Sequence, residues 1–335
     1  MKSLLNTLIA LITVIAAGAA PAVATYDFYA AVAMTKAQKN SSTPLDSGLY
    51  RRDEQGEWHH FGPRILAVTG LAVHPTDPRL MLLPSADGVV RSNDSGKTWR
   101  KTTGWEVADV RSIVFDPVQP ERVYAVTAWG PLRSTDAGAT WQLAQNGLTL
   151  LFGQTIVADA AKSGRVLVGN EAGLYVSHDA AQHWERVKFP EVLVLRLVQG
   201  RSDPKVLLAT TQGRGAFVSR DGGTSWTSVD AGTATANLYA AAIAPEDASL
   251  FALGGWNSGV RLSTDGGRTW TDRSAGLPNK HIFVLAFDPG VKSRLWASTF
   301  EEGTFYSDDL GLTWKFGGLY GGYGSDFIFV PTSRP

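Results

Sequence analysis

One short phrase recurs six times along this chain, and its recurrence limits the possible folds more than any other feature. Copies such as "RSNDSGKTW" at 91 and "RLSTDGGRTW" at 261 share the pattern S-x-D-x-G-x-T-W, called a box below. Successive box serines lie 42 to 44 residues apart. A fixed period of this size indicates a repeat architecture in which each unit is one supersecondary module. The six boxes cover residues 92–99, 134–141, 177–184, 219–226, 263–270 and 307–314.

Each repeat unit predicts four short antiparallel strands. In one unit the segments "RSIVFDP", "RVYAVTA", "PLRS" and "TWQLA" are rich in alternating or β-branched apolar residues, and Gly, Pro and Asp turns separate them. Such runs are strand signals, and no helical periodicity of useful length interrupts them. Four antiparallel strands in a unit of about 43 residues make one blade of a β-propeller. The predicted class is therefore all-β.

The remaining segments complete a seventh blade. A degenerate box at 51–58 ends on Trp58, which follows its preceding glycine, Gly48, one residue sooner than in the other boxes. The segment "SDFIFVP" near the C-terminus matches a first strand without successors, and "YDFYAAVAM" at 26–34 matches a second strand without a predecessor. We therefore predict a single domain over 25–335, a seven-bladed β-propeller closed by pairing of the C-terminal strand with the N-terminal blade. Closure leaves only short, protected sheet edges.

Residues 1–24 differ in composition from the rest of the chain. Lys2 precedes a long apolar run, and Ala22-Val23-Ala24 forms a small-residue cleavage site. This pattern predicts a secretory signal peptide and export to the periplasm or the exterior. An uncleaved anchor is the alternative, although the run is short for a membrane span. After residue 24 the sequence predicts no transmembrane segment.

Composition excludes several classes of function. The 31 basic and 31 acidic residues cancel, so no global charge draws the chain to nucleic acid or an anionic membrane. The chain has no cysteine, which excludes disulfides and thiolate metal sites. The histidines lack ligand spacing, and the glycine-rich stretches lack the strand–loop–helix context of a phosphate loop. We expect no metal, no cofactor and a monomer.

The box itself is interpreted as a device that locks a hairpin turn. Its aspartate can accept bonds from turn N–H groups, its glycine can take a positive φ, and its tryptophan buries its ring. Boxes spread around a rim cannot converge on one substrate, so a structural role is favoured over calcium binding or acid catalysis. The aspartates are Asp94, Asp136, Asp179, Asp221, Asp265 and Asp309. The closing tryptophans are Trp58, Trp99, Trp141, Trp184, Trp226, Trp270 and Trp314.

These boxes resemble the Asp-box repeats of bacterial neuraminidases, which several families share. The uniform spacing and "FGPRIL" around Arg64 depart from sialidases, a single propeller departs from xyloglucanases, and the lack of cysteine departs from sortilin-type receptors. The chain is most similar to the photosystem II stability/assembly factor family. That resemblance implies an exported seven-bladed propeller with a folding or assembly role, but it does not identify the client.

The predicted recognition surface is the face around the channel mouth. Loops between blades and turns between second and third strands share this face and carry aromatic residues beside charges, a composition typical of binding surfaces. Trp129 and Trp256 occupy tight turns; the alternative is that each packs over its neighbouring blade. Arg214 could hold a carboxylate or phosphate, or be simply solvated. The candidate residues are Trp105, Trp129, Glu171, Arg214, Trp256, Asn257, Glu301 and Glu302.

Two weaker patterns complete the picture. At five of six equivalent positions just before a second strand stand basic residues that could form a ring on the opposite face for an acidic partner; Ser249 breaks the series. These residues are Arg79, Arg122, Arg165, Lys205 and Arg294. The glycine-rich stretch 317–327 predicts a flexible lip at the channel mouth.

Three functions remain open from sequence. The preferred one is a non-enzymatic scaffold that binds a protein partner and assists the assembly or stability of a complex. The second is a carbohydrate-active protein, either a sialidase- or xyloglucanase-like glycoside hydrolase or a lectin, which uses the same face. The third is a purely structural envelope module. A glycosidase needs two carboxylates roughly 5 to 10 Å apart, and the available acids lie in different blades, so no catalytic residue is predicted.

Overall fold

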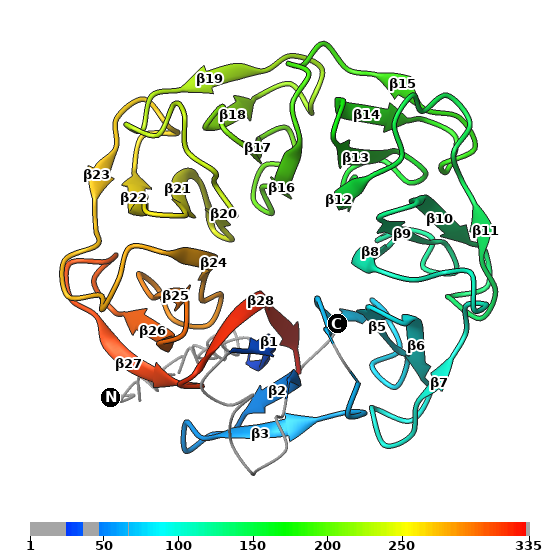
Figure 1. Ribbon diagram of the computed structural model, residues 1–335, viewed down its shortest axis with the longest axis horizontal. Helices are drawn as coiled ribbons and strands as arrows, with labels where there is room; N and C mark the ends of the chain where they lie inside the picture. Colours follow the sequence, from blue (N-terminus) through cyan, green and yellow to red (C-terminus); the bar gives the residue numbers. More distant parts are fainter. Residues whose placement is uncertain (1–24, 36–46, 66, 333–335) are drawn as a thin grey trace, which may run out of the picture.

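The computed structural model describes residues 25–35, 47–65 and 67–332, so the predicted signal peptide lies outside the described part. The chain forms a ring of seven four-stranded antiparallel sheets around a central axis (Figure 1). Every regular element of the described residues is a strand. The predicted seven-bladed, all-β propeller is confirmed.

Each blade contributes one strand to each of four concentric layers. The strands of each layer are given below in the order of blades 1 to 7. The innermost strands are β28 (Gly322–Pro331), β4 (Ala72–Val73), β8 (Val110–Phe115), β12 (Gly153–Ala158), β16 (Val194–Gln199), β20 (Ala240–Ala244) and β24 (Ile282–Phe287). The second strands are β1 (Tyr26–Met34), β5 (Met81–Ser85), β9 (Val123–Thr127), β13 (Val166–Asn170), β17 (Leu207–Thr211), β21 (Asp247–Gly255) and β25 (Leu295–Thr299).

The outer half of each blade is shorter. The third strands are β2 (Gly48–Arg52), β6 (Gly88–Ser92), β10 (Gly130–Ser134), β14 (Gly173–Ser177), β18 (Ala216–Ser219), β22 (Gly259–Ser263) and β26 (Gly303–Ser307). The outermost strands are β3 (Trp58–Phe61), β7 (Arg100–Lys101), β11 (Gln142–Leu143), β15 (Glu185–Arg186), β19 (Thr227–Val229), β23 (Thr271–Asp272) and β27 (Lys315–Gly318).

The two ends of the chain share blade 1. Strand β28 pairs with β1 in antiparallel register, with Phe28 opposite Phe329 and Ala30 opposite Phe327. The rings of Phe28 and Phe329 stack at 4.3 Å. Figure 1 shows the last strand of the chain beside the first. The predicted closure is therefore confirmed, and it gives β1 a partner on both edges.

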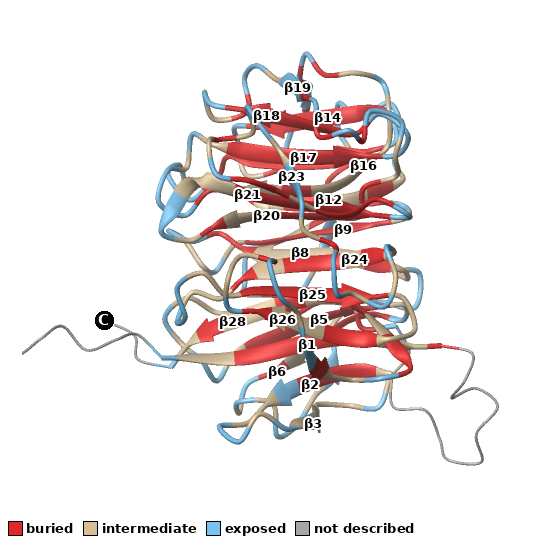
Figure 2. Ribbon diagram, turned by 90° about the vertical axis from the view of Figure 1, so that its left-hand side faces the viewer, coloured by how far each residue is buried: buried red, intermediate tan, exposed pale blue. Residues whose placement is uncertain are grey.

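The core lies between the blades rather than within one sheet. Second strands such as β9, β13 and β17 are buried along their whole length, and the exposed residues gather in turns and outer strands (Figure 2). One cluster joins Tyr124 of blade 3 to Val166 and Trp184 of blade 4. A fully buried large apolar side chain stabilises the fold by roughly 1.5 to 3 kcal/mol, so each blade depends on its neighbours.

The glycine-rich stretch 317–327 is not the predicted lip. Most of it belongs to β27 and β28, with a turn between them. Strand β28 passes close to blade 7: a Cβ on Gly324 would stand 3.1 Å from the Cβ of Ser298. Glycine serves close packing here. Since the described residues contain no helix, none of them forms a helical membrane span.

Each of the six boxes forms the same turn. The serine hydroxyl donates to the aspartate at 2.7 to 2.8 Å and accepts the backbone N–H four residues after it. The aspartate accepts the N–H four residues beyond itself at 2.8 to 2.9 Å. In the box of blade 3, Gly138 has φ 79°, and a Cβ there would lie 2.8 Å from Leu82 of blade 2. The turn thus packs against the preceding blade.

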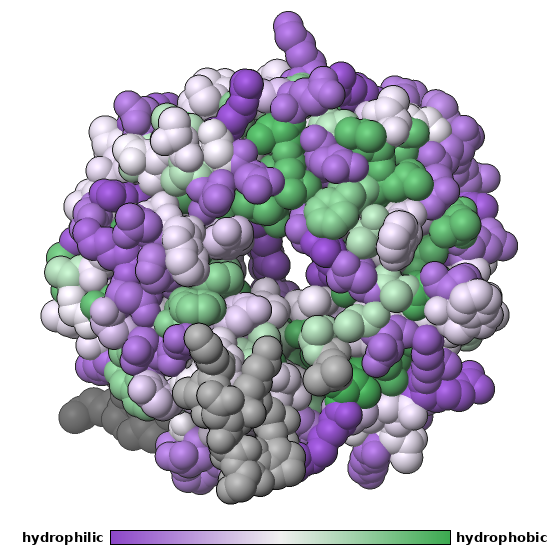
Figure 3. Space-filling view, in the orientation of Figure 1, coloured by the Kyte–Doolittle hydropathy of each residue, from purple (hydrophilic) through white to green (hydrophobic). Residues whose placement is uncertain are grey.

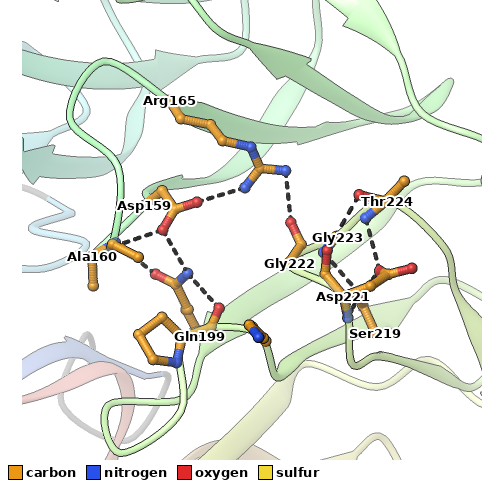
Figure 4. Close-up of polar contacts among 12 residues, drawn as sticks. Asp159, Ala160, Arg165, Gln199, Ser219, Asp221, Gly222, Gly223 and Thr224 are labelled. Atoms are coloured by element: carbon orange, nitrogen blue, oxygen red, sulfur yellow. Dashed lines mark hydrogen bonds and ion pairs between the residues drawn. The ribbon is translucent and has the colours of Figure 1, made fainter.

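Polar contacts also link the blades on the box face. Between blades 4 and 5, Arg165 lies 2.6 Å from the Asp159 carboxylate and donates to the Gly222 carbonyl of the next box at 2.6 Å (Figure 4). Gln199 of blade 5 donates to the other oxygen of Asp159 at 3.1 Å. Burial opposes ionisation of Asp159, but bonds from Ala161, Arg165 and Gln199 outweigh it and lower the pKa of Asp159.

Candidate functional site: an aromatic cluster at the channel mouth

Six ring-bearing side chains meet on the face opposite the boxes. They come from blades 6 and 7 and from the start of β28: Tyr239, Trp256, His281, Phe283, Phe300 and Tyr323. This set is called the aromatic cluster below. Phe283 lies at its centre, with its ring 5.1 Å from that of Tyr239 and 4.7 Å from that of Tyr323. Contacts of this kind contribute about 0.5 to 1.5 kcal/mol each beyond burial.

Trp256 is held firmly although it is 45% exposed. It lies in the turn between β21 and β22, where its backbone N–H donates to the Asn237 carbonyl at 3.0 Å. Asn257 takes φ 55° and donates its N–H to Nδ1 of His281 at 3.1 Å. The rings of Trp256 and His281 stack at 3.9 Å. The indole is therefore fixed on one side by its neighbour blade and open on the other.

A pocket of about 250 Å³ lies beside this cluster at the channel mouth, lined by Tyr239, Phe283, Tyr323 and polar residues. Arg111 lies 2.6 Å from the Asp109 carboxylate. Arg196 of β16 lies 2.5 Å from Asp326 of β28, so this ion pair joins blades 5 and 1. Figure 3 shows that the ring surrounds a central opening. This volume is below the roughly 300 to 1,000 Å³ of most small-molecule sites.

The structure brings together only part of the predicted recognition residues. Asn257 borders the aromatic cluster, and Glu301 and Glu302 follow Phe300 in the turn between β25 and β26. Both glutamates are half-buried. Trp256 itself matches both earlier interpretations, because it packs on the neighbouring blade and keeps an exposed face.

The other predicted residues lie on different blades. Trp105 is 91% exposed after β7, and Trp129 is 66% exposed between β9 and β10. Among the described residues, neither ring contacts the aromatic cluster. Glu171 and Arg214 are exposed in the turns of blades 4 and 5. These four do not converge on one site.

Sequence reasoning missed the residues of the inner strands. Phe283, Arg196 and Asp326 lie on β24, β16 and β28, next to apolar strand residues that hide them in the pattern. Alternation along these strands gave no distinguishing signal, because successive side chains point to the two faces of a blade and both faces pack against neighbouring blades.

On the box face, the carboxylates of the box aspartates accept hydrogen bonds from their own turns. Hydrogen bonds from the hydroxyl and N–H of Thr98 lower the pKa of Asp94 to about 2, and the equivalent bonds of Thr313 do the same for Asp309. Within the described ranges, no group of three or more His, Asp or Glu side chains is placed to hold a metal ion. Among the basic residues of that face, Arg79 pairs with Asp77, Arg165 with Asp159 and Arg294 with Asp308.

Comparison with known proteins agrees with this architecture. Residues 130–253 match the family model described as sortilin, neurotensin receptor 3. No curated protein is significantly similar in sequence.

Solved structures show the same fold at low identity. A GH74 enzyme of Niastella koreensis is 18% identical with a TM-score of 0.69, covering 88% of this chain and 55% of its own. A GH74 xyloglucanase of Xanthomonas campestris is 19% identical with a TM-score of 0.68, covering 82% of this chain and 51% of its own. This chain thus spans about half the length of both enzymes.

A structure of YCF48 bound to D1 peptide is 18% identical with a TM-score of 0.60, covering 80% of this chain and 95% of its own. The chain is therefore similar in structure both to YCF48 and to GH74 enzymes, and what it shares with them is the propeller fold.

Proposed function

We propose that this protein is an exported, non-enzymatic scaffold that binds a protein partner through the aromatic cluster and assists assembly of a complex. The observation that carries the proposal is Trp256, an indole fixed by stacking and by the hydrogen bond of its neighbour Asn257 while nearly half its surface stays open. Rigid aromatic anchors at the centre of a patch dominate the energetics of protein interfaces because little entropy is lost on binding.

The comparisons support a polypeptide ligand. YCF48 has been solved with a D1 peptide bound, and its length is almost fully covered by this chain. We propose by analogy that an extended segment of the partner crosses the channel mouth, with an apolar side chain against Trp256 and the channel ion pairs at its flank.

A carbohydrate ligand is the second candidate, because an exposed indole beside glutamates also suits a sugar ring. Hydrolysis by inversion or retention needs two carboxylates facing one bond. Among its described lining residues, the channel pocket has one carboxylate, Asp109, and Arg111 holds it in an ion pair. This favours binding over hydrolysis.

The test is a pull-down from the exporting cell with wild-type protein and with Trp256→Ala. We expect wild-type protein to retain a partner, and we expect the amount recovered with the variant to be at least tenfold lower. Trp105→Ala, on another blade, is the matched control and should retain the partner within twofold. Equal retention by Trp256→Ala would contradict the proposed face. Release of sugar from a glycan array by the purified protein would contradict the scaffold proposal.

A further inference from the structure

The seventh box differs from the six others at the residue on which the turn depends. Aligned on their glycines, "GLYRRDEQGEW" places Arg52 where "GVVRSNDSGKTW" has the box serine. The serine hydroxyl joins two bonds of every complete box, and a guanidinium cannot replace it. The blade 1 turn keeps the aspartate bond, with Asp53 accepting the N–H of Glu57 at 2.8 Å, but it lacks the bonds of the serine hydroxyl.

The altered turn accompanies a large cavity between blades 7 and 1, on the box face. Its volume is about 1010 Å³. Phe28, Phe329 and Trp296 give it aromatic walls, and its charged lining contains arginines, among them Arg52, as well as carboxylates. At the equivalent position between blades 4 and 5, the next box supplies the Gly222 carbonyl to Arg165.

Among the described residues Arg52 forms no ion pair, although the nearby carboxylates Asp53 and Asp288 partly compensate its charge. Its guanidinium lies over the Trp296 ring, 5.1 Å from the centroid. Its Nε atom is buried and has no hydrogen-bond partner among the described residues. A buried donor without a partner destabilises the fold, and more strongly when it is charged.

The carboxylates of the lining are engaged elsewhere. Asp27 lies 2.6 Å from Arg51, and Asp53 lies 2.6 Å from His59. Asp288 accepts the indole N–H of Trp296 at 3.2 Å. Glu54 is exposed to solvent. None of these carboxylates forms an ion pair with Arg52, so its guanidinium is open to a closer anionic partner.

We propose that this cavity binds a small carboxylate attached to an aromatic or apolar group. The carboxylate would accept hydrogen bonds from the guanidinium of Arg52, because a guanidinium can donate two parallel hydrogen bonds to one carboxylate. The apolar part would lie against Phe28 and Phe329. The cavity lies on the face opposite the aromatic cluster, so this site is independent of the proposed partner surface.

Isothermal titration with phenylacetate tests the proposal, with phenylacetamide as the uncharged probe of nearly equal shape. We expect saturable 1:1 binding of phenylacetate and at least tenfold weaker binding of phenylacetamide. Arg52→Ser should weaken phenylacetate binding at least tenfold, and Arg52→Lys, which keeps the charge but loses the planar fork, by a smaller factor. Arg133→Ser, on the third strand of blade 3, should change it less than twofold.

Several outcomes would overturn the proposal. Equal affinity for the amide, or unchanged affinity in both Arg52 variants, would show that Arg52 does not hold a carboxylate. Equally tight binding of inorganic phosphate would assign a general anion site instead. Absence of saturable binding for phenylacetate, 4-phenylbutyrate and indole-3-acetate alike would remove the site. Circular dichroism of each variant shows that the fold is retained, and retention of the protein partner by Arg52→Ser separates this test from that of the proposed function.

Discussion

The junction between blades 4 and 5 and the junction between blades 7 and 1 are built from equivalent residues but differ in how they are filled. In the first, Arg165 is enclosed between Asp159 and a box carbonyl, with side-chain exposures of 10% and 8% for the ion pair. In the second, Arg294 stands at the same place before the second strand, but it lies 4.0 Å from Asp288, the counterpart of Asp159, and pairs more closely with Asp308, at 2.7 Å. The box that would face it is the degenerate one.

This difference indicates which junction of the propeller has space for a ligand. A complete box fills the junction with its own backbone, and the polar groups of that junction are hydrogen-bonded. At the degenerate box, the junction holds a cavity with aromatic walls, and Arg52 lies in it without an ion pair among the described residues. The same repeat that stabilises six junctions therefore marks the seventh as a candidate site, and the predictions below probe that contrast.

Removal of residues 322–335 should have the largest effect, because blade 1 would lose its innermost strand and β1 would gain a free edge. Buried Phe327 and Val330 would be lost with it. We expect loss of more than about 5 kcal/mol, enough to unfold a typical domain. Circular dichroism on heating measures it. Cooperative unfolding at an unchanged temperature would show that closure contributes little.

Arg165→Ala should destabilise strongly, since it leaves the buried Asp159 carboxylate without its cation. Breaking a buried pair in this way costs about 3 to 5 kcal/mol. The matched change Arg294→Ala removes a more exposed pair and should cost about 1 kcal/mol. Urea denaturation gives both values. Equal losses would mean that the two junctions are energetically alike.

Trp184→Phe should cost about 2 to 3 kcal/mol. Trp184 is 1% exposed and donates its indole N–H to the Ala144 carbonyl of the preceding blade at 2.7 Å, so the change leaves a buried carbonyl without a donor. Trp58→Phe removes the equivalent 2.7 Å bond to Gly317, but at a less buried position. We expect about 1 kcal/mol there, measured by the same denaturation. A larger loss at Trp58 would reverse the proposed order of the junctions.

Acid should weaken the complete boxes gradually. The pKa values of Asp94 and Asp309 are lowered to about 2 in the folded protein, against about 3.9 in an unfolded chain. A lowered pKa contributes stability above the unfolded pKa and loses it as the pH falls toward the folded value. Urea midpoints should therefore change little between pH 7 and 5 and fall between pH 4 and 2. A midpoint that rises on acidification would contradict this assignment.

The fold was predictable because the repeat is periodic and its turns are strongly marked. Blade number, strand order and the pairing of the C-terminal strand with the N-terminal blade all followed from spacing and strand patterns. The site was only partly predictable. Trp256 was found from its place in a tight turn, whereas Phe283 was hidden in an apolar strand.

Failures of prediction have physical causes as well. The stretch 317–327 resembled a loop because glycine marks flexibility as well as close packing, and only the neighbouring Ser298 shows which applies. In the sequence, Arg52 looked like one more departure of the degenerate box from the S-x-D-x-G-x-T-W pattern. Its chemistry became visible only with Trp296 beneath it, 244 positions later in the chain.

Photo-crosslinking in the exporting cell tests the central functional claim most directly. A benzoylphenylalanine at position 256 reports contacts of the aromatic cluster, and one at Leu143, an exposed residue of an outermost strand, is the control. The account predicts a discrete crosslinked partner from position 256 and none from position 143. A crosslink confined to position 143, or none from position 256, would contradict it.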